Sequence, residues 1–169
     1  MHGARIWCIV AYRKVCKMTL SPHFTADEFT NSDTADRLCI DNSMPIALLD
    51  NARATAAMLE RIREHLGSIK GKEVPIVLTS GYRCPMLNKA IGSTDRSDHI
   101  RAQAADFKAP AFGTPLEVCK ALAQVIDVLG IGQLIYEHTW IHVSTRTPEK
   151  VINRIITVAG RDYVAGIVA

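Results

Sequence analysis

Two histidines and an aspartate have the side chains that a divalent metal ion takes as ligands. His99 and Asp106 are seven residues apart in the stretch SDHIRAQAAD, and His142 lies in the apolar stretch WIHVS. Two imidazole nitrogens and one carboxylate oxygen form a ligand set of catalytic zinc, which keeps its fourth position for water. Zinc in such a site lowers the pKa of the water to about 7 and polarises a carbonyl group. A lone histidine is more often a loop or core residue, so the combination of all three predicts a metal site.

These side chains need strands and a loop that bring them together. If AQAADF forms a strand, Ala102, Ala104 and Asp106 point to one of its faces. His99 precedes that strand in a loop and can fold back over this face. His142 lies in an apolar run that follows QLIY, a pattern typical of a β-hairpin. We therefore expect the three ligands to converge on one side of a sheet.

The other predicted elements are mostly helical. Apolar residues recur at helical spacing in residues 45–67, and Gly67 is suited to the C-terminal cap. Thr114 and Glu117 have the spacing of a capping box at the start of a further helix, which Gly130 ends. The remaining expected elements are a buried strand at 74–79, a short helix at 85–92 and the hairpin within 132–146. This order of elements predicts an α+β domain with helices packed on one side of a mainly antiparallel sheet.

Composition limits the classes of protein to consider. A chain of 169 residues that is 48% hydrophobic is expected to close one core, which we place in a single domain over residues 18–169 and expect to be a monomer. The formal net charge of +3 is too small and dispersed to predict a nucleic-acid groove. The sequence has no apolar run of the roughly 20 residues that a membrane helix needs. Its five cysteines have no paired C-x-x-C spacing, so we expect reduced thiols.

The first seventeen residues differ from the rest. Their apolar stretch, residues 6–12, is followed by Arg13 and Lys14, without the small residues of a cleavage site, so it makes a poor secretion signal. Residues 1–17 are then either an N-terminal extension upstream of a natural start at Met18, or an ordinary strand or helical turn. The sequence leaves both open.

Three stretches, in the same order, resemble a known family. SDHIRAQAAD resembles the Ser-x-His-x-x-Gly-x-Ala-x-Asp signature of the D-alanyl-D-alanine carboxypeptidase-type zinc peptidases. SGYRCPMLNKAIG and WIHVS are similar to the blocks on either side of it. The resemblance covers residues 18–154, is closest to the small single-domain members found in phages and prophages, and implies a hedgehog/D,D-peptidase-like fold. Ala102 stands at the glycine of the signature, which is tolerable in an extended strand but not where φ must be positive.

The resemblance also implies roles for individual residues. Zinc would be bound by His99, Asp106 and His142. Arg83, in the SGYR block, would hold the substrate carbonyl or the developing oxyanion, although a surface salt bridge is the plain alternative. Trp140 and Ser97 are expected to contact substrate, and for Ser97 a turn-capping role is the alternative.

The general base is assigned from its distance in sequence to the last histidine ligand. Many relatives have an acidic residue three positions before the last histidine ligand, where this chain has Thr139. Glu137 lies five positions before His142, and a tight hairpin turn would bring its carboxylate to the open side of the metal. We therefore assign Glu137 as the base. A solvated Glu137 and proton transfer by His138 are the alternatives.

The expected substrate is the peptide stem of bacterial peptidoglycan. The family implies either a D-Ala-D-Ala carboxypeptidase or an endolysin-like endopeptidase. A non-catalytic module that binds wall peptides and a structural component of a phage particle are the alternatives. We expect synthesis in the cytoplasm without a clear signal peptide, and action on the cell wall after release or export by another route.

Overall fold

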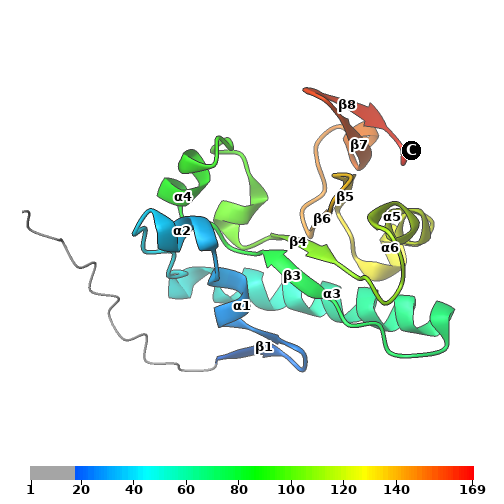
Figure 1. Cartoon of the computed structure of the whole chain (residues 1–169), viewed down its shortest axis with the longest axis horizontal. Coiled ribbons are helices and arrows are strands. Elements are labelled where there is room, and N and C mark those ends of the chain that lie inside the picture. Colours follow the sequence, from blue (N-terminus) through cyan, green and yellow to red (C-terminus); the bar gives the residue numbers. More distant parts are fainter. Residues whose placement is uncertain (1–17) are drawn as a thin grey trace, which may run out of the picture.

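The computed structural model describes residues 18–169, so the predictions for residues 1–17 lie outside the described residues. The helices are α1 (Ala26–Thr30), α2 (Asp33–Arg37), α3 (Leu49–Lys70), α4 (Pro85–Ala90), α5 (Pro115–Ala123) and α6 (Ile126–Leu129) (Figure 1). The strands are β1 (Thr19–Ser21), β2 (Phe24–Thr25), β3 (Val77–Ser80), β4 (Ala104–Lys108), β5 (Gln133–Tyr136), β6 (Ile141–Ser144), β7 (Ile155–Ala159) and β8 (Asp162–Ala165). Short 3-10 helices span Ile46–Leu48, Asp98–Arg101 and Val151–Asn153.

Six of the strands form one sheet in the order β3-β4-β6-β5-β7-β8. Neighbouring strands are antiparallel except β5 and β7, which are parallel. β1 and β2 form a separate two-stranded sheet, and β1 packs against α3. The mixed α+β class with a mainly antiparallel sheet is confirmed.

The central strands β4, β5 and β6 have two different faces. Ala105, Phe107, Leu134, Ile141 and Val143 are fully buried on one face and belong to the same core cluster as residues of α3 and α5. Because strand residues alternate, their neighbours along each strand point to the other face. That face carries the polar side chains of the site. Packing of all helices on one side of the sheet stays a prediction.

α3 is the long amphipathic helix that the sequence predicts, but it ends later. The helix continues through Gly67 to Lys70, and Gly71 forms its C-terminal cap with φ 64°. A left-handed cap favours glycine because it has no Cβ. Gly71 meets this need, so the prediction of Gly67 as the cap is wrong.

The region predicted as one helix up to Gly130 contains two. The capping box of Thr114 and Glu117 is confirmed at the start of α5. The helical backbone is interrupted at Val125, where φ is −133°, and α6 then leads to the left-handed cap at Gly130. Buried side chains of both helices contribute to the core.

The sheet edges differ from the sequence-based expectation. β3 spans four residues rather than six, and as an edge strand it leaves Val77 52% exposed, so it is not the buried strand that was predicted. The hairpin of β5 and β6 is confirmed. No element was predicted for the segments that form β1, β2, β7 and β8.

Candidate metal centre

The loop that carries His99 has a left-handed turn at its end. Ser97 begins the 3-10 helix Asp98–Arg101, and its Oγ accepts a hydrogen bond from the backbone N–H of His99 at 3.4 Å. Ala102 ends this helix with φ 55° and is fully buried. The prediction that Ala102 belongs to the extended strand is therefore wrong, because β4 begins only at Ala104. A left-handed alanine is strained by about 1–2 kcal/mol relative to an ordinary conformation, a strain that glycine avoids.

Asp106 and His142 are brought together by strand register. They are directly opposite each other in the antiparallel pair of β4 and β6. Directly opposed residues have Cβ atoms about 5 Å apart and point to the same face. Both side chains are therefore on the face opposite the apolar core. The sequence-based prediction that these two residues share a face is explained by this pairing.

The atoms that can bind a metal lie close together. His99 Nε2 is 3.2 Å from His142 Nδ1 and 3.2 Å from Asp106 Oδ1, and His142 Nδ1 is 2.8 Å from Asp106 Oδ1. Neighbouring ligand atoms of tetrahedral zinc are roughly 3.3 Å apart, since each lies about 2.0–2.1 Å from the ion. The three residues form a possible metal site, with all ligand atoms within 4.8 Å of one another. A shift of a few tenths of an ångström would accommodate the ion.

The protonation of His99 favours a cation at this point. Its Nδ1 is 2.6 Å from the carbonyl oxygen of Gly81, which can only accept a hydrogen bond, so Nδ1 carries a proton. Burial lowers the pKa of His99 and favours the neutral ring. The lone pair of Nε2 then faces the Asp106 carboxylate at 3.2 Å, an arrangement that a cation bound between the two acceptors would stabilise. A carbonyl that fixes the tautomer in this way is typical of a metal-bound histidine.

Asp106 is ionised in this environment. Burial by itself would raise the pKa of Asp106, but the imidazoles of His99 and His142 beside its carboxylate hold that pKa well below its usual range. A carboxylate with a low pKa and a neutral imidazole are the protonation states that bind zinc.

Arg83 lies beside these ligands. Its Nη2 is 3.9 Å from Asp106 Oδ2, its side chain is 15% exposed, and its backbone N–H donates to the carbonyl of His99. Among the described residues, the buried Nε of Arg83 has no hydrogen-bond partner. A permanent cation therefore lies beside the candidate metal ligands.

Asn42, which sequence reasoning missed, holds the segment of Arg83 in place. Its side-chain amide donates to the carbonyls of Thr30 and Tyr82 at 2.8 and 3.1 Å and accepts from the N–H of Cys84 at 2.7 Å. Asn42 is 2% exposed and lies 41 residues before Arg83 in the chain. Because the bonds are to backbone groups distant in sequence, no local pattern signals them.

Glu137 lies in the turn between β5 and β6. The N–H of Glu137 donates to the carbonyl of Trp140, and Tyr136 pairs with Ile141, so the turn is tight. Ile135 is opposite His142, and alternation places Glu137 on that same side of the sheet. Burial raises the pKa of Glu137. The ring of His138 instead donates from Nε2 to the carbonyl of Val158 at 2.7 Å, which engages one of its two nitrogens.

An open cleft of about 310 Å³ joins these side chains. All of the predicted site residues line it, which are Arg83, Ser97, His99, Asp106, Glu137, Trp140 and His142. The roles of Arg83, Ser97, Trp140 and Glu137 stay predictions, because lining a cleft assigns no chemical role. The turn-capping bond of Ser97 is present, but the same hydroxyl lies at the cleft.

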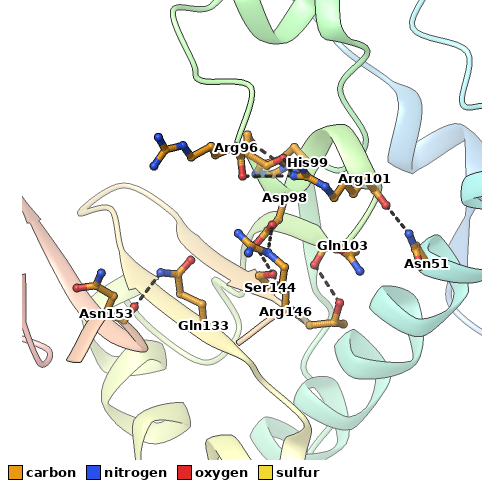
Figure 2. A network of polar contacts seen from close by, with 12 residues as sticks. Asn51, Arg96, Asp98, His99, Arg101, Gln103, Gln133, Ser144, Arg146 and Asn153 are labelled. Atoms are coloured by element: carbon orange, nitrogen blue, oxygen red, sulfur yellow. Dashed lines mark hydrogen bonds and ion pairs between the residues drawn. The ribbon is translucent and has the colours of Figure 1, made fainter. Parts of the chain in front are cut away.

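Two further cleft residues, Asp98 and Arg146, were missed by sequence reasoning. Asp98 is buried, and its carboxylate accepts hydrogen bonds from Ser144 and Arg146 (Figure 2). Both lie within four residues of a candidate metal ligand, Asp98 next to His99 and Arg146 four after His142. That proximity was the available signal.

Comparison with known proteins gives one family. A family model described as Peptidase M15 matches residues 22–144, which include all three candidate metal ligands, Arg83 and Glu137. A search of curated proteins finds no match. Within residues 18–169, none of the helices combines the length and apolar character needed to cross a membrane.

Proposed function

The chain belongs to the peptidase M15 family, which consists of zinc metallopeptidases, and we propose that it hydrolyses peptide bonds in the stems of bacterial peptidoglycan. His99, Asp106 and His142 would hold the zinc ion. We further propose that residues 18–169 form a single peptidase domain that acts as a monomer. In this proposal the protein is made in the cytoplasm and acts on the cell wall after release or export.

The observation that supports this proposal most strongly is the approach of His99 Nε2 to Asp106 Oδ1. The bond from Nδ1 to Gly81 leaves the lone pair of Nε2 facing a carboxylate at 3.2 Å. A bound cation removes the repulsion between these two acceptors. The set of two nitrogens and one oxygen leaves one position of a tetrahedral zinc open, as in catalytic rather than structural sites.

The surrounding side chains have separate roles in the proposed reaction. Bound zinc would supply a Lewis acid and lower the pKa of a coordinated water. Glu137 takes a proton from the attacking water and passes it to the leaving amine. The Arg83 guanidinium stabilises the negative charge that develops on the substrate carbonyl oxygen. Trp140 and Ser97, at the cleft, contact the substrate.

The test combines metal analysis with a cleavage assay. Wild type and His142→Ala are incubated with zinc and dialysed, and each is then incubated with peptidoglycan fragments that are analysed by mass spectrometry. We expect about one zinc ion per chain and new peptide products for wild type only. His23→Ala is the matched control, because His23 is exposed and bonded to Glu60 on α3, outside the cleft.

The products distinguish the remaining alternatives. Loss of a terminal D-alanine indicates a carboxypeptidase, and cleavage inside the stem indicates an endopeptidase. Wild-type protein that holds zinc and binds stem peptides but leaves them intact is a binding module, and the proposed hydrolysis is then wrong. Equal zinc content in wild type and His142→Ala contradicts the proposed metal site.

A further inference from the structure

A second cationic group is fixed in the cleft beside the metal ligands. Arg146 lines the cleft together with His99, Asp106 and His142, and its side chain is 46% exposed. Its Nε donates to Asp98 Oδ1 at 2.5 Å. Among the described residues, this is the one hydrogen bond of its guanidinium, so both terminal nitrogens keep donors for another partner.

The carboxylate that holds Arg146 is itself firmly placed. The side chain of Asp98 is 6% exposed, and its Oδ2 accepts a hydrogen bond from the fully buried hydroxyl of Ser144 at 2.8 Å. Ser144 Oγ also accepts from the backbone N–H of Arg146 at 3.0 Å. Figure 2 shows Asp98 directed toward Ser144 and the guanidinium of Arg146. The guanidinium is thereby oriented before any ligand arrives.

This cluster has a fixed position relative to the metal ligands. Asp98 directly precedes His99, and Ser144 is two residues beyond His142 on the same face of β6. Two residues along a strand advance about 6.5–7 Å. Arg146 lines the same cleft, so a peptide of a few residues whose scissile bond lies at the metal site can reach it.

We propose that Arg146 is a specificity-determining residue that binds a carboxylate of the substrate away from the scissile bond. This inference rests on the proposed function. An arginine with free terminal nitrogens matches a carboxylate in geometry and charge. Asp98 is a positioning residue, because it acts on the substrate only through Arg146.

Arg96 is the natural comparison within the same cleft. It is exposed and also lines the cleft, but among the described residues its side chain has no hydrogen bond. Figure 2 shows it extended away from Asp98. Binding a substrate would have to order the Arg96 side chain first, whereas Arg146 is already ordered. Arg146 and not Arg96 should therefore discriminate between substrates.

The experiment uses a stem peptide in which each carboxylate is converted in turn to a carboxamide. The zinc-loaded wild type, Arg146→Gln and Arg96→Gln are compared by kcat/KM for each peptide. We expect wild type to prefer one carboxylate over its carboxamide by about 10-fold, a typical value for one charge-assisted hydrogen bond. Arg146→Gln should remove this preference, and Arg96→Gln should retain it. The carboxamide peptide with the lower kcat/KM shows whether Arg146 binds a terminal or a side-chain carboxylate.

Binding to the zinc-free proteins, measured by calorimetry, gives a second readout that needs no catalysis. If hydrolysis fails for every peptide but the loss of carboxylate preference in Arg146→Gln persists in Kd, the proposed function is wrong and the role of Arg146 stands. If Arg146→Gln weakens all peptides equally, or Arg96→Gln has the same effect, the inference is overturned.

Folding of the variants is controlled by two further substitutions. Arg146→Gln leaves the buried Asp98 without its cation, so Asp98→Asn combined with Arg146→Gln removes this charge while Ser144 keeps an acceptor. The double variant should show the same lost preference as Arg146→Gln. Asp98→Asn alone should reduce the preference for the carboxylate over its carboxamide, but by less than Arg146→Gln does. A full preference in the double variant contradicts the proposal.

Discussion

Replacing Glu137 by glutamine tests the assignment of the general base. Glutamine has the shape of glutamate but cannot take a proton from the attacking water. Loss of a general base lowers rates by about 100- to 10,000-fold, equivalent to roughly 3–5 kcal/mol in activation free energy. We expect kcat of the zinc-loaded enzyme to fall within this range while KM and zinc content stay close to wild type, because Glu137 is not among the three candidate metal ligands.

The same substitution should not destabilise the fold. Among the described residues, the half-buried carboxylate of Glu137 accepts no hydrogen bond, so none is lost. Burial, with a smaller contribution from Asp106, raises the pKa of Glu137 above its ordinary value of 4.5. A group with a raised folded-state pKa contributes stability below its unfolded-state pKa, and this is lost as the pH rises through the folded-state pKa. At neutral pH, the zinc-free Glu137→Gln protein should therefore be as stable as wild type or more stable in urea.

The pH dependence of activity is a further test of this assignment. Glu137 acts as a base only when ionised, so kcat/KM of wild type should rise with pH through an inflection that reports its ionisation. The residual activity of Glu137→Gln should lack this inflection. Zinc content measured at each pH separates loss of the base from protonation of the histidine ligands.

Glu149→Gln serves as the matched control, since Glu149 is exposed and lies outside the cleft. It should keep wild-type activity and pH dependence. Full activity of Glu137→Gln with zinc bound would refute the assignment, and His138 would then be the next candidate. A loss of zinc in Glu137→Gln would instead show that Glu137 supports the metal site.

Two further substitutions test the segments that support the site. Asn42→Ala breaks three buried hydrogen bonds, each worth about 1 kcal/mol, so the free energy of unfolding in urea should fall by about 3 kcal/mol. Asn51→Ala is the control, because it breaks only one hydrogen bond and should lower the free energy of unfolding by about 1 kcal/mol or less. Equal losses in the two variants would contradict the role of Asn42. Gly81→Ala places a Cβ 2.7 Å from the backbone of Phe29, and this clash should lower the free energy of unfolding by about 1–3 kcal/mol. The variant should also bind zinc more weakly, because the Gly81 carbonyl accepts a hydrogen bond from His99. Gly92→Ala is the control, because its Cβ meets no atom within 4 Å and strains only its own backbone. We expect its zinc binding to be unchanged. Equal zinc affinity in the two variants would disprove the link between Gly81 and the metal.

The stretch SDHIRAQAAD shows how much of the site a local sequence pattern can predict. The spacing of SDHIRAQAAD predicts His99 and Asp106 as neighbours in space, and the structure places them 3.2 Å apart. The same stretch predicts an extended backbone for Ala102, and this is wrong because the residue is left-handed. An alanine carries no sign of a positive φ, because only the surrounding bonds impose it. These include the hydrogen bond from Thr55 on α3 to the carbonyl of Ala102.

The sequence by itself determined the ligand types, the long helix α3, the capping box of α5 and the hairpin of β5 and β6. These follow from side-chain chemistry and from periodicity within a few neighbouring residues. Only the tertiary structure decided that Asp106 pairs with His142, that Asn42 holds the segment of Arg83, and that Asp98 orients Arg146 in the cleft. Each of these contacts joins residues at least 36 positions apart. Strand register and the burial of hydrogen-bonding groups set such contacts, and both arise only when the whole core is packed.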